Sequence, residues 1–134
     1  MMNLKSQEGF TFIEVMISMS VIVLLAVGFL MSATSLQAAN MAAFERSIAL
    51  QDANQVIETM RNTASTGTFP ANVIALYANN ATVSGYTSLT SESVRVAYAS
   101  TTANPLDVTV TVSYNENGRR AVTQVLRTYI TQRS

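Results

Sequence analysis

The chain has 134 residues, of which 49% are hydrophobic and only 12% are charged, and its eight basic and eight acidic side chains give no net charge. This composition excludes a disordered, highly charged chain and gives no basic surface of the kind that binds nucleic acid. The absence of Cys and His removes the usual zinc ligands, the thiol nucleophile and the imidazole base. We therefore expect no metal, no cofactor and no enzymatic activity, although an enzyme that uses only carboxylates stays open.

The hydrophobic residues are concentrated near the N-terminus. Residues 15–33 form an uncharged run of 19, and no charged residue follows until Glu45. A membrane-spanning helix needs about 20 residues. A secretory signal peptide has a shorter apolar region, of roughly 7–15 residues, followed by a cleavage site of small residues. The run therefore predicts a membrane anchor that is retained.

Glu14 is the charged residue next to this run. A carboxylate near the bilayer is costly, and it usually has a partner or a function. Taken alone, Glu14 allows two interpretations: it reaches the lipid headgroups and water, or it has a specific partner.

The residues around Glu14 narrow the choice. Residues 9–18 read GFTFIEVMIS, after a short polar leader, MMNLKSQE. Gly9, Phe10 and Glu14 thus stand directly ahead of the apolar run. This combination closely resembles the class III signal (GFTFIEV) of type IV pilins and type II secretion pseudopilins.

The resemblance implies a role for each of these residues. A membrane prepilin peptidase would cut between Gly9 and Phe10, remove the leader 1–9 and N-methylate Phe10. Glu14 would neutralise the N-terminal amine of a neighbouring subunit. This is physically reasonable, because a carboxylate buried in an apolar helix bundle needs a paired cation.

The resemblance also implies partners and a location. Family members assemble helically, with their first helices bundled in the filament core. The expected partners are other pilin or pseudopilin subunits, the prepilin peptidase and an inner-membrane assembly platform. The expected location is the bacterial inner membrane, as a single-pass protein with a cytoplasmic N-terminus, and after assembly a filament in the periplasm or at the cell surface.

A second stretch narrows the subfamily. Residues 45–61 read ERSIALQDANQVIETMR and resemble the R-x-x-A-L-x-x-A-x-x-x-x-E-x-M-R pattern of PilV-type minor pilins and of the minor pseudopilin I of type II secretion. The matching positions are Arg46, Ala49, Leu50, Ala53, Glu58, Met60 and Arg61. The chain lacks both the proline in the membrane helix and the C-terminal cysteine pair of many major pilins, which favours a minor subunit.

The sequence predicts one long helix from Phe10 to about Ala64, because this stretch has no proline and a single glycine. Residues 10–36 would be its membrane-spanning and filament-core half, and residues 37–64 its amphipathic half. The predicted buried face of the second half, read at 100° per residue, comprises Leu36, Ala39, Ala43, Ala49, Leu50, Ala53, Val56, Ile57 and Met60.

A second apolar group lies on another side of the same helix. Met41, Phe44 and Ile48 follow the spacing i, i+3, i+7. Because a helix that packs against one small domain needs only one apolar face, these residues are candidate contacts with another subunit. The alternative, equally weighted, is that the C-terminal domain wraps around the helix.

The rest of the chain predicts a connecting loop over residues 65–92, with one short element around 72–77, and an antiparallel sheet over 93–134. The alternation of apolar and polar residues predicts three strands, at roughly 93–100, 106–115 and 120–130. Packed against the helix from Ala49 to Met60, they give an α+β protein with the pilin fold.

Asn117-Gly118 predicts a two-residue hairpin turn of type I′ between the last two strands. Centring the turn there predicts the cross-strand pairs Glu116 with Arg119, Tyr114 with Ala121, Val112 with Thr123, and Val110 with Val125.

The sequence thus predicts a structural minor pilin-like subunit of a type IV pilus, which helps to initiate or cap filament assembly. A minor pseudopilin of a type II secretion system is the alternative, with a major pilin third. A membrane-anchored module that binds a ligand through its sheet and loop also stays open.

Overall fold

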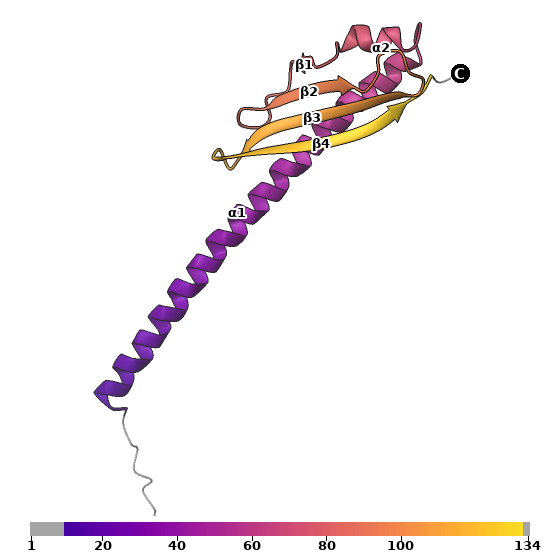
Figure 1. Cartoon of the computed structure of the whole chain (residues 1–134). Helices are drawn as coiled ribbons and strands as arrows, with labels where there is room; N and C mark the ends of the chain where they lie inside the picture. The colour runs from indigo at the N-terminus through magenta and orange to yellow at the C-terminus, as the bar shows by residue number, and fades with distance from the viewer. Residues whose placement is uncertain (1–9, 133–134) are drawn as a thin grey trace, which may run out of the picture. The chain divides into compact units, whose positions relative to one another are not determined.

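The computed structural model describes residues 10–132 of the chain (Figure 1). The predictions for Gly9 and for the leader 1–9 lie outside these residues. The chain divides into two compact units, Met1–Ala39 and Asn40–Ser134, and each is described by itself. The expected α+β class is confirmed, because a long N-terminal helix is followed by a small antiparallel sheet.

Two helices and four strands make up the secondary structure of the described residues. They are α1 (Phe12–Ala64), α2 (Ala71–Leu76), β1 (Thr82–Val83), β2 (Ser93–Tyr98), β3 (Leu106–Glu116) and β4 (Arg120–Ile130). The boundary between the two units falls within α1.

Helix α1 extends for 53 residues without proline. Its one glycine, Gly28, costs only about 1 kcal/mol in a helix interior. Beyond Ala64 the chain turns, and the side-chain amide of Asn72 donates to the backbone oxygens of Thr63 and Thr66. Thr63 lies in the last turn of α1, where carbonyl groups have no intrahelical partner, and Thr66 lies in the turn that follows.

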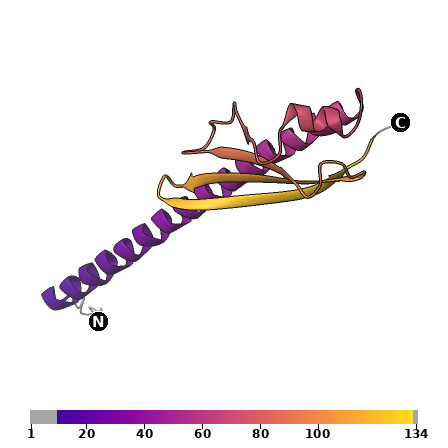
Figure 2. The ribbon, with the colours of Figure 1, turned by 45° about the horizontal axis from the view of Figure 1, so that its top comes forward.

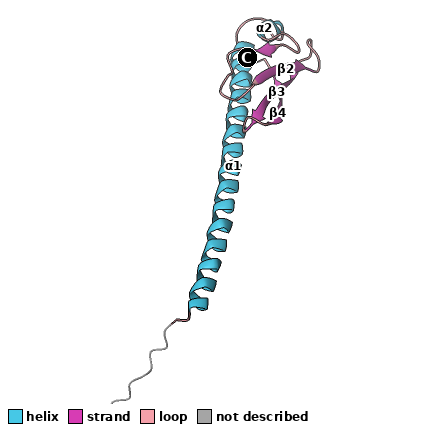
Figure 3. Ribbon diagram, turned by 90° about the vertical axis from the view of Figure 1, so that its left-hand side faces the viewer, coloured by secondary structure: helices cyan, strands magenta, loops and turns pink. Residues whose placement is uncertain are grey.

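The core of the second unit lies between α1 and one face of the sheet (Figures 2 and 3). Small side chains on α1 let the strands approach, and the strands contribute mainly valines. The buried apolar residues of α1 are Ala49, Ala53, Val56, Ile57, Met60 and Ala64, and the fully buried valines of the sheet are Val94, Val96, Val108, Val110 and Val112.

The predicted buried face of α1 was wrong at four positions: Leu36 and Leu50 are 64% and 41% exposed, and Ala39 and Ala43 are exposed as well. The buried positions begin at Ala49 and follow the spacing i, i+3, i+4, i+7. Leu50 lies at the edge of this face, about 20° beyond Ile57. Asp52 occupies the buried face instead, and it is only 8% exposed.

The sheet is antiparallel throughout, in the order β1-β2-β3-β4. Strands β2, β3 and β4 confirm the three predicted strands, and α2 confirms the short element expected around 72–77. Strand β1 was not predicted. It pairs only Thr82 with Arg95 and Val83 with Val94, and two residues are too few to produce an alternating pattern.

The turn between β3 and β4 is where the sequence placed it. Asn117 and Gly118 have φ angles of 52° and 67°, as a type I′ turn requires, and the Arg119 N–H donates to the Glu116 oxygen at 3.1 Å. The predicted two-residue connection is wrong, however, because three residues, 117–119, separate β3 from β4. The register is therefore shifted by one residue, and Glu116 pairs with Arg120 rather than with Arg119.

The cause of this shift is the apolar content of β4. In the observed register Tyr114 pairs with Val122 and Val110 with Leu126. A shift of one residue exchanges the two faces of a strand. It turns Val122, Leu126 and Ile130 toward the core, whereas the predicted register would have buried the smaller Ala121 and Thr123 together with Val125. Val125 is 60% exposed.

The tip of this hairpin is attached to α1 by polar contacts. The Arg46 guanidinium donates from Nε to Glu116 Oε1 at 3.1 Å, and its Nη2 lies 3.1 Å from the same oxygen. Glu45 Oε2 accepts a hydrogen bond from the Asn117 N–H at 2.9 Å. Glu116 is only 7% exposed, so its carboxylate loses most of its hydration, and the Arg46 guanidinium offsets that loss.

The register can be tested with one substitution on each face of β4. Leu126→Asp should lower the free energy of unfolding by about 2 kcal/mol or more, because it turns a charge toward the core. Val125→Asp should cost about 1 kcal/mol or less, since this side chain is exposed. Thermal unfolding of the full chain in detergent micelles, followed by circular dichroism, measures both. A larger loss for Val125→Asp would support the register expected from the turn alone.

Candidate assembly and processing site

The part of α1 in the first unit is apolar around its whole circumference. Every large apolar side chain from Val15 to Met31 is between 46% and 75% exposed. Among the described helices, α1 alone is long and apolar enough to cross a membrane, with a mean hydropathy of 2.5 over 18 residues. A helix that is hydrophobic on all sides needs a covering of lipid or of other protein.

Several hydroxyl groups on this part of the helix donate hydrogen bonds to its own backbone. Ser18 donates to the Glu14 backbone oxygen at 2.7 Å, and Ser20 donates to that of Met16 at 2.8 Å. Thr34 donates to the backbone oxygen of Met31 at 2.9 Å. In hydrocarbon, where water cannot compensate, an unsatisfied polar group costs several kcal/mol, so these bonds suit the helix to an apolar surrounding.

Glu14 lies in the first turn of α1 and helps to cap it. Its Oε2 accepts hydrogen bonds from the Thr11 N–H at 3.4 Å and from the Thr11 hydroxyl at 3.5 Å. This is one half of a capping box, in which a Glu three residues after the N-cap reaches back to the N-cap N–H. Thr11 was not predicted as a functional residue, although Thr11-Phe12-Ile13-Glu14 has the spacing of this motif.

The cap leaves much of the Glu14 carboxylate available. Both bonds to Thr11 are long for their type, both use Oε2, and the side chain is exposed. None of the three ion pairs in the described residues includes Glu14. The carboxylate can therefore accept a cation from another molecule without giving up its place at the positive end of the helix dipole.

Phe10, the other predicted assembly residue, precedes the helix and is 82% exposed. Within residues 10–132 no hydrogen bond or ion pair joins Phe10 to Glu14. In the uncleaved chain the Phe10 nitrogen belongs to the peptide bond with Gly9, so the pairing of its amine with Glu14 of a neighbour stays a prediction.

The three predicted subunit contacts in the second unit differ in exposure. Met41 is 58% and Phe44 is 65% exposed, whereas Ile48 is partly buried and packs against the core. Met41 and Phe44 are thus the residues of this group whose apolar surface is free within the second unit. The contacts of Glu45 and Arg46 with the hairpin tip fix the helix next to them.

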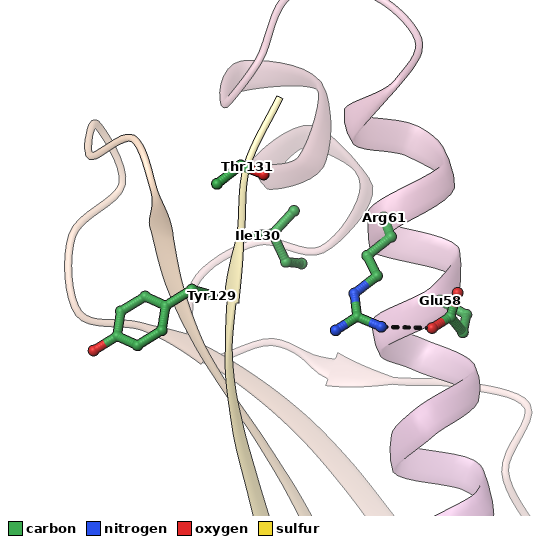
Figure 4. Close-up of a pocket in the computed structure, with 5 residues that line it drawn as sticks. All are labelled: Glu58, Arg61, Tyr129, Ile130 and Thr131. Carbon is green, nitrogen blue, oxygen red and sulfur yellow. Dashed lines mark hydrogen bonds and ion pairs between the residues drawn. The ribbon is translucent and has the colours of Figure 1, made fainter. Parts of the chain in front are cut away.

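A separate hollow of about 400 Å³ lies at the other end of the sheet (Figure 4). Arg61 lines it and is 2.7 Å from Glu58; its Nη2 also donates to the Thr128 hydroxyl at 3.4 Å. The two charges in the hollow thus neutralise each other. The described residues contain no group of three or more acidic, His or Cys side chains placed to hold a metal ion.

The comparison with known proteins found a match in the first unit. Residues 4–30 match the family model described as the prokaryotic N-terminal methylation motif. No curated protein and no solved structure matches the chain. The match and the apolar helix are consistent with membrane insertion. The N-terminal part of this chain therefore carries a type IV pilin-like prepilin signal.

Proposed function

We propose that the chain is a structural minor pilin-like subunit of a type IV pilus, which helps to initiate or cap filament assembly and has no enzymatic activity. The observation that carries this proposal is the methylation motif over residues 4–30, which continues into a helix of fully apolar circumference with a free carboxylate at its start. A membrane anchor alone would need neither the motif nor the carboxylate.

The proposed mechanism follows from the chemistry at the start of α1. A prepilin peptidase cuts between Gly9 and Phe10, and the freed amine takes up a proton, which gives Phe10 a positive charge. N-methylation of this amine keeps that charge. An assembly platform in the inner membrane then moves the helix from lipid into a bundle of similar helices. There Glu14 pairs with the Phe10 amine of a neighbouring subunit, and the need to pair both buried charges sets the register between subunits.

Met41 and Phe44 extend this interface beyond the membrane-spanning segment. Their apolar surface is exposed in the second unit, and covering it with a neighbouring helix would contribute about 25 cal/mol for each Å² removed from water. This surface gives the subunit a second, weaker contact in addition to the charge pair.

A minor pseudopilin of a type II secretion system is the second candidate, because the pattern over residues 45–61 is shared by both kinds of subunit. Much of that pattern has structural uses in this chain. Ala49, Ala53 and Met60 are buried, Arg46 holds the hairpin tip and Arg61 pairs with Glu58. The pattern therefore supports the fold in either system.

Processing is the first test. In cells with an active peptidase, the membrane-extracted chain should have 125 residues, the 134 minus the nine-residue leader, and should begin with N-methylated Phe10. Intact-mass and N-terminal peptide spectrometry measure this. Gly9→Leu should block the cut and abolish assembly. An unprocessed wild-type chain, or a Gly9→Leu chain with full function, would instead indicate a simple anchored module.

The charge of Glu14 can be separated from its capping role. Glu14→Gln keeps the cap, because Gln also serves at this position of a capping box, but it leaves the neighbour's amine unpaired. Removing one partner of a buried ion pair costs about 3–5 kcal/mol, so incorporation into sheared filaments should fall at least about tenfold. Thr11→Ala is the matched control, since it weakens the cap by about 1 kcal/mol and keeps the charge. Equal losses in both variants would mean that Glu14 acts only as a cap.

The surface made by Met41 and Phe44 gives another prediction. Phe44→Asp should leave the second unit folded, because Phe44 is exposed, but should reduce incorporation into filaments by placing a charge in the interface. Val125→Asp adds the same charge at an exposed position of β4 and serves as the control. Circular dichroism in micelles and the chain content of sheared filaments are the two measurements. Loss of the fold in Phe44→Asp would show that this residue belongs to the subunit's own structure.

A further inference from the structure

The segment 84–92, which connects β1 to β2, lies against α1 at Asp52, which lines a hollow together with Ser84, Tyr86 and Ser88 of this segment. Asp52 lies on the buried face of α1 and is 8% exposed, and Glu92 is the last residue before β2. The two carboxyl groups are close enough that Asp52 raises the pKa of Glu92. Asp52 Oδ2 and Glu92 Oε1 are both buried, and neither has a hydrogen-bond partner among the described residues.

This arrangement is costly if both groups are ionised. Two carboxylates that share a buried site repel each other, and each unpaired oxygen loses its hydration. The pKa of Glu92 is raised, mainly because burial disfavours its charged form and also because Asp52 is adjacent, although the Leu89 N–H that donates to Glu92 acts in the opposite direction.

The other titratable groups around the pair do not relieve this cost. Tyr77, which follows α2, and Tyr86, in the connecting segment, are the tyrosines nearby. Burial and then the nearby Tyr77, Asp52 and Glu92 raise the pKa of Tyr86. No Lys or Arg among the described residues forms an ion pair with Asp52 or Glu92.

We propose that Asp52 and Glu92 share one proton, and that this proton fastens the segment 84–92 to α1 as a pH-sensitive latch. The protonated carboxyl donates its O–H to the other carboxylate, so one proton satisfies both unpartnered oxygens and removes one of the two charges. The other carboxyl oxygen of Glu92, Oε2, accepts a hydrogen bond from the Leu89 N–H at 3.0 Å. This bond helps to hold the buried Leu89 in the core.

A proton fits this pair better than a divalent cation does. Ca²⁺ takes about 6–8 oxygen ligands, whereas the described residues hold no cluster of three or more candidate ligands. Both unpartnered oxygens are also hidden from solvent, so a hydrated ion would reach them only after the segment opens.

The direction of the pH effect follows from the raised pKa. The closed segment binds the proton more tightly than the open one does, so closure is favoured at low pH and weakens as the pH rises through the pKa of Glu92 in the closed state. The ion pair Asp107–Arg127 makes overall stability depend on pH in the opposite direction. Arg127 lowers the pKa of Asp107, so the stability that this pair contributes is lost as the pH falls. A local measurement is therefore needed.

Hydrogen exchange of the full chain in detergent micelles, read by mass spectrometry and corrected for intrinsic exchange, tests the proposal. Peptides that cover 84–92 should lose protection as the pH rises from about 5 to about 8, while peptides from β3 should not. Glu92→Gln should abolish this loss, because its amide donates to Asp52 permanently and its oxygen still accepts the Leu89 N–H. Asp52→Asn should do the same from the other side.

Glu58→Gln is the matched control, since Glu58 is exposed on the same helix and its loss should leave the pH dependence unchanged. The proposal is overturned if protection in Glu92→Gln still varies with pH as in the wild type, or if Glu92→Gln is unprotected at every pH. It is also overturned if Ca²⁺ or Mg²⁺ restores protection to the wild type at high pH, which would identify a divalent-cation site.

Discussion

The apolar circumference of α1 between Val15 and Met31 is the constraint on which the rest of the molecule depends. Water cannot cover this surface, so the helix exists only in lipid or against other helices. The hydroxyls of Ser18 and Ser20 in this segment accordingly bond to the helix's own backbone. The one carboxylate, Glu14, stands at its very start, where the helix dipole and Thr11 stabilise the negative charge and where a cation from a second molecule can reach it.

In the second unit α1 is covered by protein on one face only. From Ala49 onward only one face of α1 is buried, and alanines on that face let the valines of the sheet come close. Because the sheet covers a single face, Met41 and Phe44 keep their apolar surface exposed in this unit. A helix with a free apolar surface next to a folded domain is suited to a molecule that is completed by its neighbours.

The parts of this structure that depend on local pattern could be predicted from the sequence. The absence of proline predicted α1, alternation predicted β2 to β4, and Asn117-Gly118 predicted the turn. The register of β4 could not be predicted from the turn, because the burial of Leu126 decided it. The contacts Arg46–Glu116 and Asp52–Glu92 join residues far apart in the chain, and no spacing rule signals them. The cap at Thr11 could have been predicted from the sequence, since its motif is local.

The link between Arg46 and Glu116 has a mechanical consequence. It joins residues 70 positions apart and, with the bond from Asn117 to Glu45, it is the attachment of the hairpin tip to α1. Tension carried along α1 toward the second unit therefore loads this attachment before it loads the valine core. Because the ion pair and the hydrogen bond both join the hairpin tip to the same turn of α1, sliding of the helix along the hairpin would have to break the two together.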